Sequence, residues 1–136
     1  MLKKTIEEGK GGKVVLMDSI TKVNGDDKGA VVVCASHGGS SSGEFALEVP
    51  LRLVVFNDAG GGKDDAGISA LQMLQDKGVP AATVAHTSGR IGDSLDMWEN
   101  GVLSHVNAAA QELGLSVGDK VRAKLTSLVA VEAVTH

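Results

Sequence analysis

The chain has 136 residues, a formal net charge of −4, and 43% hydrophobic against 22% charged residues. This is the composition of one globular domain that can bury its own core, so we expect a single domain over residues 1–136. Scattered basic residues and only 2% aromatic residues argue against a nucleic-acid-binding groove.

The chain also lacks the marks of export or membrane insertion. No apolar run approaches the roughly 20 residues that a membrane helix needs. The first eight residues include acidic side chains and no apolar core, unlike a secretory signal. Cys34 is the only cysteine, so no internal disulfide can form, and we interpret it as a core residue of an apolar run. We expect a cytoplasmic protein without a membrane partner.

Four short apolar runs have the length and composition of buried strands. They cover residues 13–17, 29–35, 51–56 and 81–85. Because polar residues do not alternate within them, they are typical of strands covered on both faces by helices. We predict a three-layer α/β sandwich with a mostly parallel sheet of four or five strands, Rossmann-like or flavodoxin-like.

The connection between the first two runs, residues 21–29, leaves two interpretations open. Asn24 and Gly25 are typical of a tight hairpin, which would make the two strands antiparallel. Alternatively, Asp18 caps a short helix over residues 19–23 that ends at Gly25. We favour the parallel arrangement, because it gathers the polar residues after each run at one edge of the sheet.

Helices are expected at residues 2–8, 43–49, 64–77 and 93–113. In the longest, Gly101 would cost about 1 kcal/mol against alanine, which suggests that another backbone or a ligand lies close. Beyond residue 116 the pattern fits either a strand or a helix. A last edge strand over residues 128–134 could pair with another subunit.

Small polar side chains follow every predicted strand, and glycines follow most of them. The clusters are Asp18-Ser19, Ser36-His37-Gly38-Gly39, Asn57-Asp58 and His86-Thr87. Because the carboxyl ends of parallel strands meet at one edge, we expect a pocket there for a small polar or anionic ligand.

Two histidines and one aspartate are the candidate catalytic residues. His37 or His86 would be the base, since imidazole titrates near neutral pH, and Asp58 would orient it or bind substrate. Lys63 or Arg90 would hold an anionic group. The other candidate ligand-binding residues are Asp18, Ser36, Gly38, Gly39 and Asn57.

Two functions fit this pattern. One is an enzyme that transfers protons, as a lyase, isomerase or hydrolase. The other is a non-catalytic accessory or ligand-binding protein that uses the same edge. We expect a homo-oligomer in either case.

Two loops fail the test for better-known sites. A Walker-A loop ending at Lys63 would need a glycine in place of Asn57 and a hydroxyl residue in place of Asp64. Residues 39–43 match G-x-S-x-G around Ser41, but several residues separate this serine from its strand, unlike the hydrolase elbow.

A metal site could be assembled from His37, Asp58, His86 and a further aspartate. None of the established ligand spacings supports it, so we predict no metal and identify no cofactor.

Overall fold

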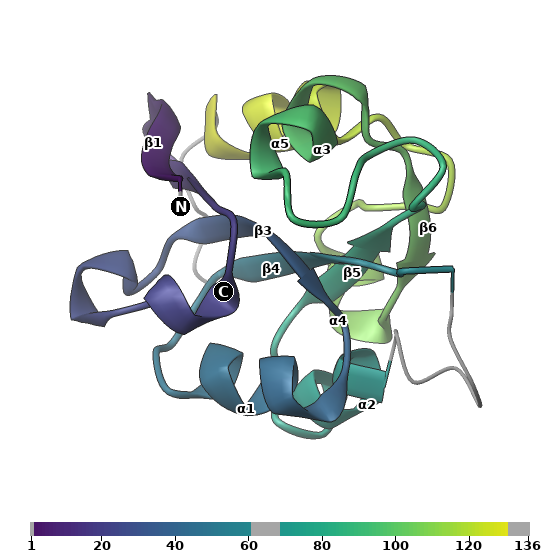
Figure 1. The fold of residues 1–136 in the computed structure, drawn as a ribbon. Helices are drawn as coiled ribbons and strands as arrows, with labels where there is room; N and C mark the ends of the chain where they lie inside the picture. The colour runs from purple at the N-terminus through teal and green to yellow at the C-terminus, as the bar shows by residue number, and fades with distance from the viewer. Residues whose placement is uncertain (1, 61–68, 131–136) are drawn as a thin grey trace.

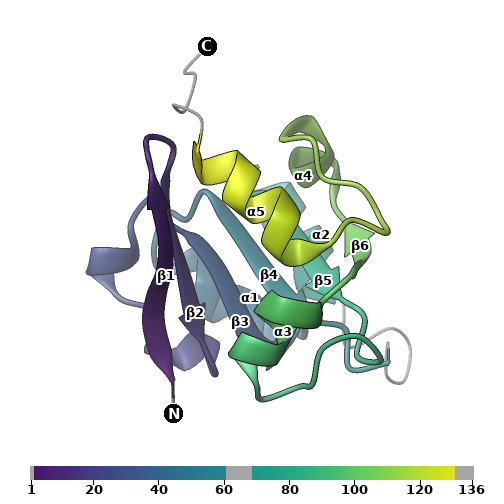
Figure 2. The same ribbon diagram turned by 90° about the horizontal axis from the view of Figure 1, so that it is seen from above.

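The computed structural model describes residues 2–60 and 69–130, which form one sheet with helices on both faces (Figures 1 and 2). The strands are β1 (Lys3–Gly9), β2 (Gly12–Met17), β3 (Val31–His37), β4 (Leu53–Asn57), β5 (Ala81–Val84) and β6 (Leu103–Val106). The helices are α1 (Ser40–Leu47), α2 (Ser69–Asp76), α3 (Ser94–Asn100), α4 (Ala108–Glu112) and α5 (Val121–Ala130), with 3-10 turns η1 (Ile20–Lys22) and η2 (Gly25–Asp27).

The strands lie in the sheet in their order along the chain, from β1 to β6. Strands β2 to β5 are parallel, whereas β1 and β6 are antiparallel to their neighbours. The α/β class is therefore confirmed, but the expected sheet of four or five strands is corrected to a mixed sheet of six. Its sequential order also differs from the Rossmann and flavodoxin orders.

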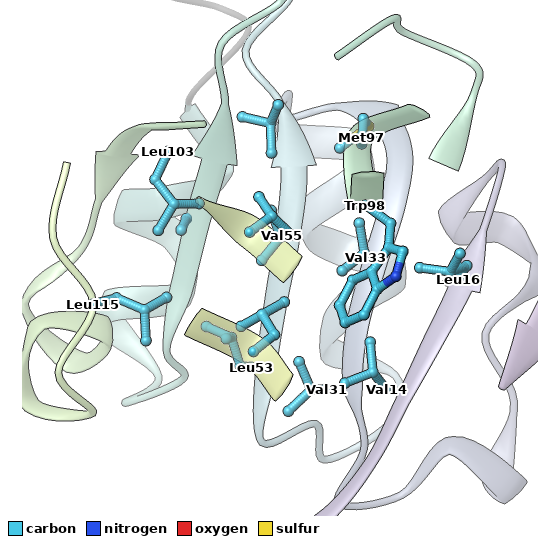
Figure 3. Close-up of a cluster of buried hydrophobic side chains, with 14 of the residues drawn as sticks. Val14, Leu16, Val31, Val33, Leu53, Val55, Met97, Trp98, Leu103 and Leu115 are labelled. Carbon is cyan, nitrogen blue, oxygen red and sulfur yellow. The ribbon is translucent and has the colours of Figure 1, made fainter. Parts of the chain in front are cut away.

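Two buried clusters of apolar side chains cover the two faces of the sheet. Alternate strand residues such as Val32 and Val54 point toward α1 and α2. Their neighbours, such as Val33 and Val55, pack against α3 and α5, with Trp98 of α3 only 3% exposed (Figure 3). The four parallel strands are thus buried on both faces, as their continuous apolar sequences predict. The core prediction for Cys34 is also confirmed, since this residue is fully buried.

The expected helix at residues 2–8 is wrong, because this segment is β1. Gly9 and Gly12 face each other across a two-residue turn, and Gly12 has a φ of 124° that favours glycine. Leu2 and Ile6 pack against the core, while most other side chains of this edge strand are exposed. Hairpin pairing with β2 therefore overrides the local helical pattern.

The parallel arrangement of the first two predicted strands, now β2 and β3, is confirmed. Asn24 does not form a hairpin turn but caps η2, where its side chain accepts a hydrogen bond from the Asp26 N–H. Ser19, rather than Asp18, caps η1 through the Thr21 N–H. This short connection spans the strands with two 3-10 turns instead of a helix.

The expected long helix over residues 93–113 is also wrong. Asp93 does cap α3, but Gly101 ends it in an extended conformation (φ −65°, ψ 142°), and Asn107 begins α4 after β6. A Cβ at Gly101 would collide with the Met97 carbonyl, so the close backbone belongs to the preceding turn. Gly114 does end α4, with its N–H bonded to Gln111 and the next N–H to Ala110.

The remaining helices are placed differently from the expected ranges. Helix α1 begins three residues before the expected start at residue 43, and α2 agrees with the second half of the 64–77 prediction. Residues 64–68 lie outside the described part of the chain. The expected edge strand is corrected through Ala130, because α5 contains residues 128–130; the rest of that prediction lies outside the described residues.

Candidate functional site

The carboxyl ends of β2 to β5 meet at one edge, where two connections leave in opposite directions. Strand β4 leads toward α2 on one face, and β5 leads toward α3 on the other (Figure 1). In open α/β sheets, ligands bind in the crevice where neighbouring strand connections diverge in this way. Asp58 and His86 follow these two strands and therefore lie at the divergence.

Asp58 and His86 form a hydrogen-bonded pair. One carboxylate oxygen of Asp58 accepts from the backbone N–H groups of Gly60 (2.8 Å) and His86 (3.0 Å), and lies 3.3 Å from His86 Nδ1. The side chain of Asp58 is 9% exposed and that of His86 is 51% exposed. The aspartate is thus fixed while the imidazole reaches solvent.

The ionised form of Asp58 is stabilised by its donors. Burial raises the pKa of Asp58, but hydrogen bonds from the Gly60 N–H, the Ser104 hydroxyl and His86 together outweigh it and hold the pKa below its ordinary value. An ionised Asp58 accepts the Nδ1 proton of neutral His86. In that tautomer, Nε2 of the half-exposed ring carries the free lone pair.

Strand β6 adds polar groups that the sequence prediction missed. Thr83 pairs with His105 and Val84 with Leu103, so Ser104 is the extra residue of a bulge. The buried Thr83 hydroxyl lies 2.9 Å from Ser104 Oγ and 3.1 Å from His105 Nδ1. Because the Ser104 hydroxyl also helps lower the pKa of Asp58, this polar group of β6 borders the Asp58–His86 pair.

The flanking Gly101 and Asn107 are the only sequence signals for β6. A helix-breaking glycine and a capping asparagine bound a four-residue apolar–polar segment. The apolar period of residues 93–113 favours a helix more strongly, which hides the strand and the groups it carries.

Other predicted site residues hold the connection between β5 and α3 (residues 85–93, the crossover segment) across the strand ends. Asp18 accepts from the N–H and hydroxyl of Ser94, at 3.0 and 2.8 Å. The Asn57 side-chain amide donates to the Gly89 carbonyl at 2.7 Å. Ser36 Oγ instead accepts from the Ile20 N–H at 3.0 Å, which positions η1. These three side chains have structural partners.

His37 is not joined to the Asp58–His86 pair. It ends β3 opposite Asn57, so two strand spacings, about 10 Å of backbone, separate it from the end of β5. Within residues 2–60 and 69–130, no hydrogen bond connects His37 with Asp58 or His86. Its Nδ1 accepts from the Gly39 N–H at 3.1 Å, and it lines a different pocket.

Gly38 and Gly39 join this second region to the sheet and to α1. The Gly38 N–H donates to the Asn57 carbonyl, and the Gly38 carbonyl accepts from the Ala70 N–H. Gly39 is the N-cap of α1. Both glycines thus have structural roles in the backbone around the His37 pocket.

A pocket of about 350 Å³ adjoins His86 and is lined by residues 86–91 with Asp96. Arg90 is exposed there, and its backbone N–H donates to Asp96 Oδ2 at 2.8 Å. This bond, together with the Asn100 amide, holds the pKa of Asp96 below its ordinary value. Lys63, the other predicted anion-binding cation, lies outside the described residues.

A larger pocket of about 520 Å³ lies between α3 and α5 and is lined by Gly101 beside the end of β5. Its walls include the long exposed side chains of Glu99, Lys120 and Arg122. None of the predicted site residues lines it. The charged side chains that line it are all exposed, whereas the strand-end pockets adjoin buried polar side chains.

In the part of the chain that the structure describes, no cluster of three or more His, Cys, Asp or Glu side chains could hold a metal ion. None of the described helices is long and apolar enough to cross a membrane. Comparison of the chain with protein-family models, curated proteins and solved structures finds no match.

Proposed function

We propose that this protein binds a small polar or anionic molecule at the carboxyl edge of the sheet and that His86 exchanges a proton with it. The observation that carries the proposal is the pair formed by a buried, ionised Asp58 and an exposed His86. Such a carboxylate orients an imidazole and stabilises the cation formed when the ring accepts a proton.

In this mechanism, His86 Nε2 takes a proton from the substrate and returns it in a later step. The Asp58 carboxylate, 3.3 Å from Nδ1, stabilises the intervening imidazolium. Arg90 in the adjacent pocket would hold an anionic group of the substrate. Lyase, isomerase and hydrolase reactions all contain such a step, and Lys63 remains a second candidate for the anionic group.

A non-catalytic ligand-binding or accessory function is the alternative. It is favoured by the structural role of Asp18, Ser36 and Asn57, whose side chains hold backbone segments at the strand ends. In that case the polar strand ends would shape a binding surface without chemistry.

The first test measures how available His86 is as a base. Diethyl pyrocarbonate modifies unprotonated imidazole nitrogens, and mass spectrometry gives the rate for each histidine. At pH 8, where an ordinary imidazole is neutral, we expect Asp58→Asn to slow modification of His86 by about three- to tenfold, because the ring loses the carboxylate that favours the proton on Nδ1. The exposed His37 in the same molecule is the internal control. An unchanged His86 rate would contradict the proposed role of Asp58.

The second test separates the enzyme from the binding protein. The protein is incubated in D₂O with pyruvate or dihydroxyacetone phosphate, and ¹H NMR follows loss of the protons beside the carbonyl. A base at His86 gives exchange that His86→Gln removes. Ligand-induced shifts at His86 without exchange would support the non-catalytic alternative.

We further propose that the protein acts in the cytoplasm as a homo-oligomer. Sedimentation velocity at several concentrations tests the assembly. A single species of 13.9 kDa at every concentration would contradict it.

A further inference from the structure

We propose a second binding site in the pocket between η1, α1 and the crossover segment, where Ser42 and the first turn of α1 bind the phosphate of a phosphomonoester. The pocket has a volume of about 330 Å³. It uses none of the atoms of the Asp58–His86 pair, so the proposal stands independently of proton transfer.

Ser42 is the side chain that points to a ligand. It is only 6% exposed and lines this pocket, yet its hydroxyl has no hydrogen-bond partner among residues 2–60 and 69–130. In that same part of the chain, every fully enclosed side-chain nitrogen or oxygen is hydrogen-bonded. The Ser42 Oγ is therefore not enclosed by protein and faces the pocket. A nearly buried hydroxyl of this kind needs a partner from outside the chain.

The start of α1 supplies backbone donors beside this hydroxyl. Gly39 caps the helix without a side-chain hydrogen bond, and the first backbone bond of the helix runs from the Gly43 N–H to the Gly39 carbonyl. The N–H groups of Ser40, Ser41 and Ser42 have no partner within the described residues. Free N–H groups at the positive end of a helix favour an anion.

His37 adds a donor from the end of β3. Its Nδ1 accepts a hydrogen bond from the Gly39 N–H, so the neutral ring carries its proton on Nε2. Among residues 2–60 and 69–130, no aspartate or glutamate lines the pocket. A pocket lined by hydrogen-bond donors and by no carboxylate favours an oxyanion over a metal ion.

The donors and the apolar wall of the pocket favour a phosphomonoester among oxyanions. Two backbone N–H groups of residues that line the pocket, Ser41 and Ser42, together with a hydroxyl and an imidazole N–H exceed what two carboxylate oxygens need, and suit the three terminal oxygens of a phosphate. Ile20, Phe45 and Ile91 form an apolar wall of the same pocket. That wall would contact the organic group of the ester.

NMR titration of the full chain with inorganic phosphate, phenyl phosphate and acetate tests the proposal. We expect saturable shifts at the amides of Ser40, Ser41 and Ser42, at least about threefold tighter binding of phenyl phosphate than of inorganic phosphate, and weaker binding of acetate. Saturable binding of inorganic phosphate alone, with no gain for phenyl phosphate, would overturn the phosphomonoester assignment.

Variants of Ser42 supply the decisive comparison. Ser42→Ala should weaken phosphate binding about three- to tenfold, whereas Ser127→Ala, an exposed serine on α5, should leave it unchanged. Ser42→Asp keeps a helix-stabilising residue in the first turn but repels the anion, so binding should be lost while the fold, checked by circular dichroism, persists. Equal affinity in Ser42→Asp, or shifts scattered over surface lysines without saturation, would overturn the site. His86→Gln should bind phosphate normally, which separates this site from the proton-transfer proposal.

Discussion

Asp18 shows how one carboxylate joins segments that lie 76 residues apart. It follows β2 and accepts hydrogen bonds from the Leu2 N–H and from the N–H and hydroxyl of Ser94. Burial raises the pKa of Asp18, but these donors outweigh it and hold the pKa below its ordinary value. The carboxylate thus fixes the start of α3 against the sheet.

Replacement of Asp18 should destabilise the folded protein at pH values where its carboxylate is ionised. We expect Asp18→Asn to lower the free energy of unfolding at pH 7 by about 1–3 kcal/mol, because hydrogen bonds to a charge are lost. Since the folded pKa is lowered, the stabilisation is complete above the unfolded value near 4 and is lost as pH falls through the folded value. Urea denaturation across pH should therefore show the two proteins converging below about pH 4. Glu48→Gln, at an exposed site, is the control, and a pH-independent difference would contradict the charge-based explanation.

The Cys34 thiol should be inert in the folded protein. It is fully buried, its Sγ donates to the Val55 carbonyl, and burial raises its pKa to about 12. Because the thiolate is the reactive form, we expect no reaction with dithionitrobenzoate at pH 8 until urea unfolds the chain. Rapid modification without urea would contradict the buried position.

At the scale of elements, Asn107 holds together three segments around β5. Its side-chain oxygen accepts from the N–H groups of Ala81 and Ala110, and its amide nitrogen donates to the carbonyls of Leu71 and Val79. One asparagine therefore begins α4 and also fixes α2 and the segment that follows it against the sheet.

The isosteric change Asn107→Asp should be strongly destabilising. At pH 7 it places a buried carboxylate against two carbonyl oxygens, and we expect a loss of about 3 kcal/mol or more in the free energy of unfolding. The loss should shrink toward low pH, where a protonated carboxyl can donate one bond. Thermal unfolding at pH 7 and 5 measures both effects, and Gln111→Glu, an amide-to-carboxylate change on the exposed side of α4, is the matched control.

The end of α3 should tolerate no side chain at residue 101. A Cβ there would meet the Met97 carbonyl and lie 3.1 Å from a Val84 methyl group. We expect Gly101→Ala to destabilise the protein by about 1–3 kcal/mol through overpacking. Gly25→Ala is the control, because no atom lies within 4 Å of a Cβ at that position. Equal urea midpoints for the two variants would contradict this packing.

At the scale of the whole molecule, three carboxylates with lowered pKa values hold the same connection. Asp58 binds the start of the crossover segment, Asp96 binds the Arg90 N–H, and Asp18 binds Ser94 at its end. The connection lies across the carboxyl ends of the parallel strands, beside both proposed sites. Protonation of these three carboxylates should therefore release the crossover segment from this edge of the sheet.

Trp98 reports this release, because it is the only tryptophan and is buried under α3. All three carboxylates have lowered pKa values, so their stabilisation is lost as pH falls below about 4. We expect the Trp98 emission to shift to longer wavelength over that range. An unchanged emission down to pH 2 would contradict the role of the carboxylates.

The sequence by itself determined the buried central strands of the sheet and where polar residues follow them, and it favoured their parallel arrangement. Continuous apolar runs require burial on both faces, and Asn57, Asp58 and His86 follow such runs directly. Whether His37 or His86 meets Asp58 stayed open, because that choice depends on how β3 and β5 lie beside β4 at this edge. The local sequence pattern predicted an element correctly where the burial of that element alone decided whether it formed a strand.

Only the tertiary structure decided the edges of the sheet and which polar residues meet. Pairing with β2 makes residues 3–9 a strand. The extended backbone of Gly101 ends α3, and the residues after it pair with β5 as β6. The partners of Asp18, Asn57 and Ser36 come from distant segments, so their structural roles have no local signal. The same holds for the hydroxyl of Ser42. That it has no hydrogen-bond partner among the described residues depends on tertiary packing, so the sequence carries no signal for it.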